Sequence, residues 1–236
     1  MTRRRWIADE VSGNRAALIG EHADHLTRVL RARVGQEFDI ATGAAVRSGR
    51  IVSIEAGRVD FELGEEIPAA AATNITLLIS VFKFDRMEWA VEKCTELGVV
   101  RIIPLLARRS EAHLASTANK RVERWRKIAL QASQQSRRTL PPEINTPIKL
   151  KEALTLSASA RIILAESEQH TLLRDVIQPN SCDLILAIGP EGGWAEVELR
   201  EFQAAGWISA SLGPTILRAE TAAIAATAVA TSILAL

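Results

Sequence analysis

Polar and apolar residues alternate along the first part of the chain, with glycines between the alternating stretches. Three of these stretches are typical of antiparallel strands, and they cover residues 37–41, 46–54 and 58–63. A shorter apolar run at residues 5–7 precedes them, and apolar residues recur at helical spacing within residues 22–33. The pattern predicts a small β-barrel or meander, which we place in residues 1–68.

The pattern changes near residue 74, after which apolar runs alternate with helical stretches. The runs expected to form strands are residues 75–81, 99–105, 161–165, 184–188 and 208–212. The main helical stretches are residues 86–97, 117–135 and 220–234. This alternation predicts an α/β domain with a parallel sheet, which we place in residues 74–236. The last helical stretch is apolar on almost every face, so it should be buried in the core or in a subunit interface.

Composition narrows the class of protein. Of the 236 residues, 47% are hydrophobic, which excludes a disordered chain. No apolar run reaches the roughly 20 residues of a membrane span, and charges near the N-terminus interrupt any export signal, so we expect a cytoplasmic protein. Cys94 and Cys182 are far apart in the sequence and exclude a disulfide framework or a thiolate zinc site. We expect both thiols to be buried.

Charge is distributed unevenly, although the formal net charge is only +1. Between residues 108 and 138, nine basic side chains face two acidic ones. This excess indicates a polyanion partner, or alternatively a helix whose solvent-exposed face carries basic side chains without binding anything. Charge alone does not decide between the two.

Three expected strands end in loops that combine glycine, proline and charged residues. The loops are LAES at residues 164–167, IGPEGGW at residues 188–194 and LGPTILRAET at residues 212–221. Because ligands bind beyond the carboxyl ends of parallel strands, these loops predict a ligand pocket. They match neither a dinucleotide fingerprint nor a P-loop.

Other candidate sites are weaker. His22 and His25 lack a third metal ligand, and no Ser-His-Asp arrangement is evident, so we expect neither a metal nor a hydrolase. Trp89 and Trp125 lie at helical spacing among apolar neighbours, and we expect them in the core.

Several segments together resemble one family. They are RRRW at residues 3–6, HLTRVLR at 25–31, EKCTELGV at 92–99, RWRKIALQASQQS at 124–136, IGPEGGW at 188–194 and SLGPTILRAETA at 211–222. The chain therefore resembles the RsmE family of 16S ribosomal RNA uridine-N3 methyltransferases, within the SPOUT class. The resemblance implies an N-terminal PUA-like RNA-binding barrel, a C-terminal SPOUT domain with a trefoil knot, and a homodimer. It also implies S-adenosylmethionine as cofactor and, as substrate, uridine 1498 of 16S ribosomal RNA within the 30S subunit.

The resemblance also implies site residues. The cofactor would be held by Leu164, Ala165, Glu166, Ile188, Gly189, Pro190, Gly192, Gly193, Leu212, Gly213, Ile216, Leu217 and Thr221. Ribosomal RNA would be bound by Arg3, Arg4, Arg5, Arg108, Arg109, Arg124 and Arg138. Arg218 would stabilise the uracil anion, with Glu220 or Glu191 as base or orienting group. The alternatives are that Glu191 balances the cofactor's sulfonium charge and that Glu220 only caps the last helix.

Two positions depart from the family pattern. Arg137 stands where the family usually has glycine, and Trp194 stands where it usually has phenylalanine. Two rival functions also stay open. One is a non-catalytic RNA-binding assembly factor, and the other is a SPOUT methyltransferase that acts on a different nucleotide or on transfer RNA.

Overall fold

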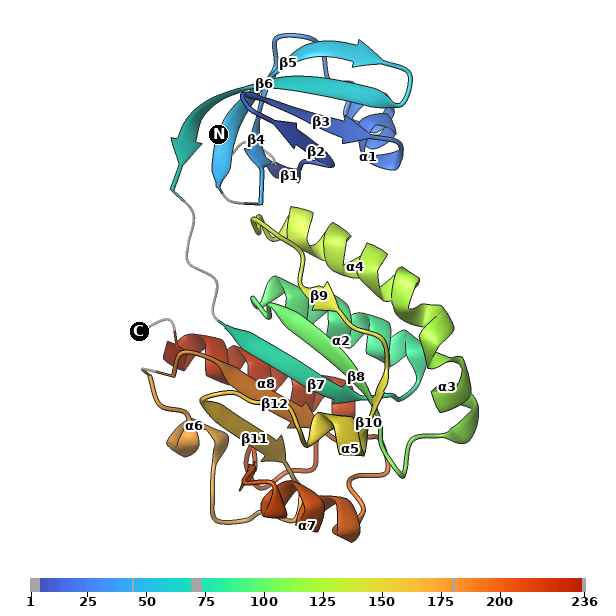
Figure 1. The fold of residues 1–236 in the computed structure, drawn as a ribbon, viewed down its shortest axis with the longest axis vertical. Helices are drawn as coiled ribbons and strands as arrows, with labels where there is room; N and C mark the ends of the chain where they lie inside the picture. Colours follow the sequence, from blue (N-terminus) through green and yellow to red (C-terminus); the bar gives the residue numbers. More distant parts are fainter. Residues whose placement is uncertain (1–4, 44, 69–73, 180, 235–236) are drawn as a thin grey trace. The chain divides into compact units, whose positions relative to one another are not determined.

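The structure is a computed structural model that describes residues 5–43, 45–68, 74–179 and 181–234. The chain forms two compact units (Figure 1). The first consists of residues 1–71 with residues 133–141, and the second of residues 72–132 with residues 142–236. The segment 133–141 therefore groups with the first unit, although the sequence pattern placed it within the second domain.

The first unit is a curled six-stranded sheet with the order β1-β4-β5-β6-β3-β2. Its strands are β1 (Arg5–Ile7), β2 (Glu10–Ser12), β3 (Arg15–Ile19), β4 (Glu37–Ala41), β5 (Val46–Glu55) and β6 (Arg58–Ile67). All neighbouring strands are antiparallel except β1 and β4, which are parallel. The β5–β6 register shifts at two places, and such bulges bend and twist a sheet, which accounts for the curl.

Close packing inside this curl depends on one glycine. A Cβ atom at Gly49, on β5, would lie 2.3 Å from the side chain of Ile40 on β4. Ile40 is fully buried together with Leu18, Leu26 and Phe61. The expected helix over residues 22–33 is shorter, with α1 (Glu21–Asp24) followed by a π-helical turn (His25–Val29).

The second unit is a seven-stranded sheet in which every pair of neighbouring strands is parallel. The order is β10-β8-β7-β12-β11-β13, with β9 also paired to β8. The strands are β7 (Ile75–Ser80), β8 (Arg101–Leu106), β9 (Glu143–Ile144), β10 (Ile148–Lys149), β11 (Ala160–Leu164), β12 (Leu184–Ile188) and β13 (Ile208–Ala210).

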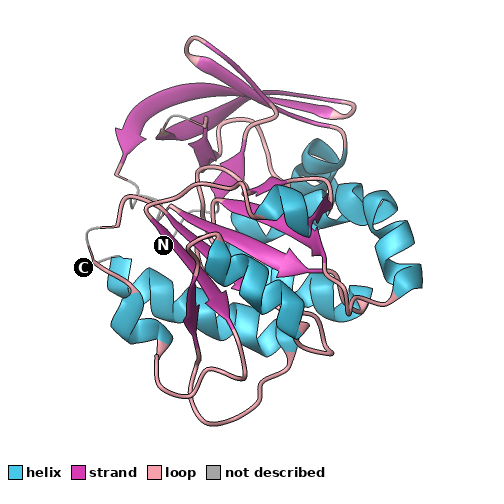
Figure 2. Ribbon diagram, turned by 60° about the horizontal axis from the view of Figure 1, so that its bottom comes forward, coloured by secondary structure: helices cyan, strands magenta, loops and turns pink. Residues whose placement is uncertain are grey.

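Helices cover both faces of this sheet (Figure 2). They are α2 (Phe84–Glu96), α3 (Ala112–Thr117), α4 (Val122–Gln135), α5 (Leu150–Ala153), α6 (Leu173–Val176), α7 (Glu196–Ala204) and α8 (Ala219–Leu234), with a 3-10 turn (Ala118–Arg121) before α4. Residues alternate between the faces as expected for a pleated sheet, so Leu77 and Ile79 join one core and Leu78 joins the other.

Helix α8 packs against α2 and against strands β7 and β12. Ala223, Ala226 and Ala230 are fully buried at this contact, and their small side chains let the helix approach closely. Burial of the apolar last helix in the core is thus confirmed. Among the described residues, no helix is long and apolar enough to cross a membrane.

Two expectations about single residues are wrong. Trp125 is fully buried as expected, but Trp89 is 49% exposed because it lies on the outer face of α2. Cys94 is buried, whereas Cys182 is exposed in the loop before β12. Burial raises the pKa of the Cys94 thiol to about 12, which leaves this thiol protonated and inert.

Candidate active site

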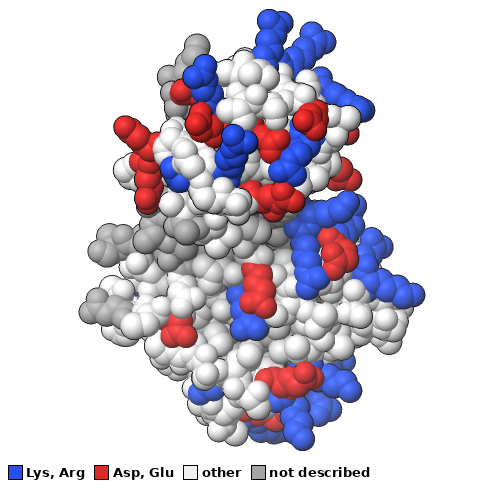
Figure 3. All heavy atoms as spheres, turned by 45° about the horizontal axis from the view of Figure 1, so that its top comes forward, with Lys and Arg blue, Asp and Glu red and all other residues white. Residues whose placement is uncertain are grey.

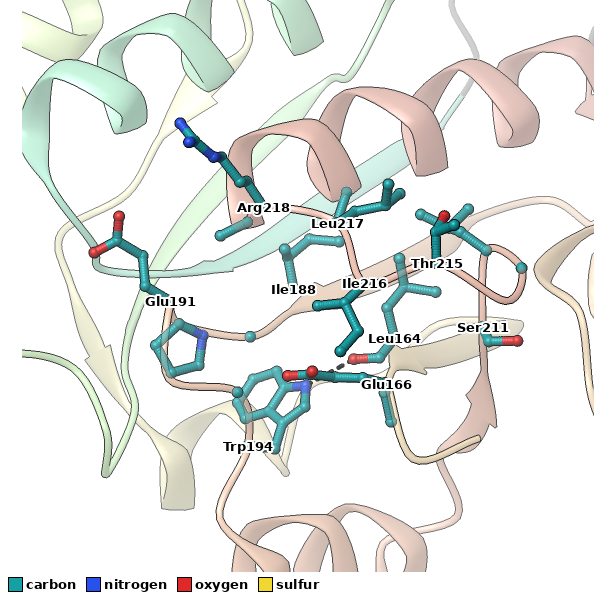
Figure 4. Close-up of a pocket in the computed structure, with 18 of the residues that line it drawn as sticks. Leu164, Glu166, Ile188, Glu191, Trp194, Ser211, Thr215, Ile216, Leu217 and Arg218 are labelled. Atoms are coloured by element: carbon teal, nitrogen blue, oxygen red, sulfur yellow. Dashed lines mark hydrogen bonds between the residues drawn. The ribbon is translucent and has the colours of Figure 1, made fainter. Parts of the chain in front are cut away.

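A pocket of about 510 Å³ lies at the carboxyl ends of β11, β12 and β13 (Figure 4). Its walls come from the three loops that follow these strands. Of the residues expected to bind the cofactor, those that line the pocket are Leu164, Ala165, Glu166, Ile188, Gly189, Pro190, Gly193, Leu212, Gly213, Ile216 and Leu217. Gly192 and Thr221 do not line it.

Trp194, Ser211, Pro214, Thr215 and Ala219 also line the pocket; they lie in or beside the loops predicted to form it but were not named individually. The remaining lining residues, Lys83, Arg86 and Ala222, lie outside those loops and were not predicted. Two of the expected catalytic residues, Glu191 and Arg218, line the pocket, whereas Glu220 does not. Among the described residues, no cluster of His, Cys, Asp or Glu is arranged to hold a metal ion.

Gly193 lets the loop after β12 approach the loop after β11. Its backbone N–H donates to the carbonyl of Pro190 at 2.9 Å, which closes a turn, and its φ is +66°. A Cβ atom at this position would lie 2.4 Å from Oε1 of Glu166. Glycine satisfies both the backbone angle and the close approach.

Trp194 ties the same two loops together. Its indole Nε1 donates to the carbonyl of Leu164 at 2.8 Å (Figure 4). Its ring packs edge-on against Phe202 at 5.1 Å between centroids. Phenylalanine, the residue usual in the family, has no N–H to donate. The substitution in this chain therefore adds a hydrogen bond to the wall of the pocket.

Apolar side chains form one side of the pocket. Ile188 and Leu164 are almost fully buried, whereas Ile216 is 80% exposed and points into the pocket (Figure 4). A flat apolar ring placed against Ile216 would remove its surface from water, which is favourable.

Charged side chains gather at another part of the pocket. Arg86, near the start of α2, donates from Nη1 to Oε1 of Glu191 at 2.5 Å. Glu220, in the first turn of α8, is 3% exposed, and its Oε2 accepts no hydrogen bond from the described residues. Arg218 forms no ion pair or side-chain hydrogen bond with the described residues, and its guanidinium lies toward the Glu191 end (Figure 4).

The loop after β8 is attached to the loop after β12 by hydrogen bonds. Arg109 donates from Nη1 to the carbonyl of Gly192 at 2.9 Å. The fully buried carboxylate of Glu198 accepts from the backbone N–H of Arg108 at 2.8 Å and of Ala195 at 2.9 Å. Sequence reasoning missed Glu198, whose only signal is a glutamate three residues after Ala195, the N-cap residue of α7, where a Ser or Thr is usual.

The arginines expected to bind RNA differ in their ion-pair partners. Arg108 is 60% exposed at its side chain and lies 3.8 Å from Glu201. Arg124 forms two hydrogen bonds with Glu88, at 2.5 and 2.7 Å, and is also 60% exposed. Lysine and arginine side chains gather at the right of Figure 3, with fewer acidic side chains among them.

Within the first unit, Arg5 is less available to RNA than expected. Arg3 and Arg4 lie outside the described residues. Arg5 is 11% exposed at its side chain, lies 3.9 Å from Asp39 and donates to the backbone carbonyl of Arg137. In this structure Arg5 therefore holds the segment 133–141 rather than presenting an open guanidinium.

The loop after α4 explains one departure from the family pattern. Arg137 has a φ of +61°, a left-handed conformation that glycine adopts readily and that costs other residues about 1 kcal/mol. The glycine that is usual at position 137 in the family would therefore adopt the backbone conformation of this turn without strain. Burial lowers the pKa of the neighbouring Arg138 guanidinium, which is only partly open to solvent.

The α/β sheet with a loop pocket at its carboxyl edge, joined to a curled β-unit, is the architecture of a class of RNA methyltransferases. The family model described as an RNA methyltransferase domain matches residues 69–231. Ribosomal RNA small subunit methyltransferase E from Rickettsia conorii is 30% identical over 212 residues, which are 88% of this chain and 85% of the relative. The same enzyme from Mycobacterium bovis is 30% identical over 91% of this chain and 85% of the relative.

Solved structures agree with these relatives. A ribosomal RNA small subunit methyltransferase E from Neisseria gonorrhoeae, bound to S-adenosyl methionine, has a TM-score of 0.85 and 30% identity over 96% of this chain and 95% of its own. A methyltransferase from Legionella pneumophila in complex with the same cofactor has a TM-score of 0.85 and 28% identity over 98% of both chains. The chain belongs to the ribosomal RNA small subunit methyltransferase E family.

Proposed function

We propose that this protein transfers the methyl group of S-adenosylmethionine to N3 of one uridine, position 1498, in the 16S RNA of the small ribosomal subunit. The observation that carries the proposal is the pocket built from three loops, in a chain whose fold matches a cofactor-bound member of its family over 96% of its length. With a ribosomal substrate, we expect the protein to act in the cytoplasm.

The pocket fits S-adenosylmethionine in size and chemistry. Its volume of about 510 Å³ is in the usual range for small-molecule sites. Leu212, Ile216 and Leu217 provide an apolar surface for adenine, and the glycines of the loop after β12 allow close approach to the backbone. When bound, the cofactor supplies an electrophilic methyl group on a sulfonium, and we place Glu191 where it balances that charge.

The target atom determines what the protein must do. N3 of uracil lies on the pairing edge and carries a weakly acidic proton, so the base must be unpaired and its proton lost. A cation beside a uracil carbonyl oxygen stabilises the resulting anion. Arg218 fits this role because it lines the pocket and has no partner among the described residues. Glu220 does not line the pocket, and we assign it an orienting role.

RNA binding by the basic residues should depend steeply on salt. If Arg108, Arg109, Arg124 and Arg138 contact four phosphates, affinity for 16S RNA should fall about 50-fold between 50 and 200 mM salt. Arg124→Gln should lower the slope of log affinity against log salt by about 0.7, the contribution of one contact to a single strand.

Arg200→Gln is the matched control. Arg200 also forms an exposed ion pair, with Glu196 at 3.1 Å, but it lies on α7 outside the basic segment. Filter binding over a salt series measures both variants. An affinity that does not change with salt would show that phosphate contacts do not hold the RNA.

We also propose a homodimer. Trp89 is 49% exposed on α2, the helix that packs against α8, and a second copy of the chain would cover this large aromatic surface. Sedimentation velocity at micromolar concentration should show a dimer, and Trp89→Ser should shift the protein toward monomer. A wild-type monomer would refute the dimer.

A methylation assay separates the proposed function from its rivals. Purified protein is incubated with labelled S-adenosylmethionine and 30S subunits from a strain that lacks the modification. We expect label in 16S RNA. RNA binding without transfer would favour an assembly factor, and label in transfer RNA alone would favour another SPOUT target.

A further inference from the structure

Arg86 connects two segments of the pocket that are more than 100 residues away from it in the sequence. Its Nη1 donates to Oε1 of Glu191, in the loop after β12, at 2.5 Å. Its Nε lies 3.7 Å from Oε1 of Glu220, at the start of α8. Arg86 itself lines the pocket and is 30% exposed at its side chain. One guanidinium thus bridges two carboxylates.

The Glu220 end of this bridge is buried. The side chain is 4% exposed, Oε2 accepts no hydrogen bond, and no other basic side chain among the described residues forms an ion pair with it. An uncompensated buried carboxylate is costly, so the nearby guanidinium is needed to keep it in place. The N-terminus of α8 adds a favourable dipole but no second positive side chain.

The bridge also fixes the position of Arg218. The carbonyl of Arg218 accepts the N–H of Ala222 at 2.8 Å in the first turn of α8, two residues before Glu220. Holding Glu220 therefore holds the backbone that carries Arg218. The other arm holds Glu191, which shares the same end of the pocket (Figure 4).

We propose that Arg86 is a positioning residue for methyl transfer: its guanidinium bridges Glu191 and Glu220 and so sets Arg218 against the reacting base. This inference rests on the proposed function. A lysine would supply the charge but not the planar fork that spans two carboxylates. The bridge should matter more for the chemical step than for cofactor binding, because the apolar surface of the pocket does not depend on it.

The first test measures single-turnover methyl transfer and cofactor affinity in Arg86→Gln and Arg86→Lys. We expect Arg86→Gln to slow transfer about 100-fold, the usual effect of a misplaced catalytic group, with a much smaller change in S-adenosylmethionine affinity by calorimetry. Arg86→Lys should recover part of the rate. A wild-type rate in Arg86→Gln, or equal losses of rate and cofactor affinity, would overturn the proposal.

Lys93 offers a matched control on the same helix. Its Nζ also bridges two carboxylates, Glu92 at 2.7 Å and Glu96 at 2.8 Å, but it does not line the pocket. Lys93→Gln should leave the transfer rate unchanged. A loss as large as that of Arg86→Gln would show a general effect of charge on α2 and would overturn the proposal.

A second test does not depend on activity. Arg86→Gln should lower the melting temperature because it leaves Glu220 buried without a counter-charge, and adding Glu220→Gln should restore the melting temperature but not the rate. Independent, additive effects of the two substitutions on the melting temperature would overturn the bridge. If the wild-type protein transfers no methyl group, the proposed function fails while this test still decides whether the bridge exists.

Discussion

Arg218→Ala should slow single-turnover methyl transfer about 100- to 1,000-fold, the effect typical of removing one group that stabilises a developing anion. Cofactor affinity should stay close to that of the wild-type protein. The reason is that the Arg218 guanidinium lies at the charged end of the pocket and forms no ion pair with the described residues, so its removal leaves no internal partner unsatisfied. Rapid-quench transfer to 30S subunits and calorimetry with S-adenosylmethionine measure the two quantities.

Arg218→Lys is the conservative companion and should keep part of the rate because it keeps the charge. Arg200→Ala, on the exposed face of α7, serves as a control that removes an arginine elsewhere in the same unit. If Arg218→Ala turns over at the wild-type rate, Arg218 does not stabilise the uracil anion.

Gly193→Val should weaken binding of S-adenosylmethionine at least about tenfold, which corresponds to roughly 1.4 kcal/mol. Valine is branched at Cβ and strongly disfavours the φ of +66° that Gly193 adopts, so the loop must change its backbone. The new Cβ would also lie 2.4 Å from Oε1 of Glu166, so the Glu166 side chain in the pocket wall would have to move. Isothermal calorimetry measures the loss directly.

Trp194→Phe is the control for the same loop. It restores the residue usual in the family and removes only the hydrogen bond to the Leu164 carbonyl, which is worth about 1 kcal/mol. Its effect on cofactor affinity should be smaller than that of Gly193→Val. Wild-type affinity in Gly193→Val would mean that the loop after β12 does not hold the cofactor.

Much of the fold could be predicted because its strands have simple patterns. The runs at 37–41 and 184–188 match β4 and β12 at both ends, since glycines, turns or polar residues bound them. The β2–β3 hairpin was missed because all three residues of β2 are exposed and give no alternation. Helix α7 was missed because its periodic part is only nine residues long.

The site was predictable only where the chemistry lies within one loop. Glycine-rich loops at strand ends indicated the pocket, and the structure places most of their residues in its lining. Arg86 and Glu198 could not be found in this way, because their partners come from distant segments that only the fold brings together. The expectation that Trp89 is buried failed for a different reason. Helical spacing among apolar neighbours does not say which face of α2 is covered by other elements.

The structure shows what the two departures from the family pattern, at Arg137 and Trp194, change locally. Arg137 keeps the left-handed backbone that glycine would adopt without cost, and Trp194 adds a donor to the pocket wall. The trefoil knot implied by the family resemblance stays a prediction, as do the roles of the individual site residues.

Nucleoside mass spectrometry of 16S RNA tests the central claim most directly. Subunits from a strain that lacks the modification are incubated with the protein and S-adenosylmethionine, and the RNA is digested and mapped. The account predicts 3-methyluridine at one position, 1498, and far less of it in the same reaction time with Arg218→Ala. A methyl group on a different base or atom, or none despite bound cofactor, would contradict it.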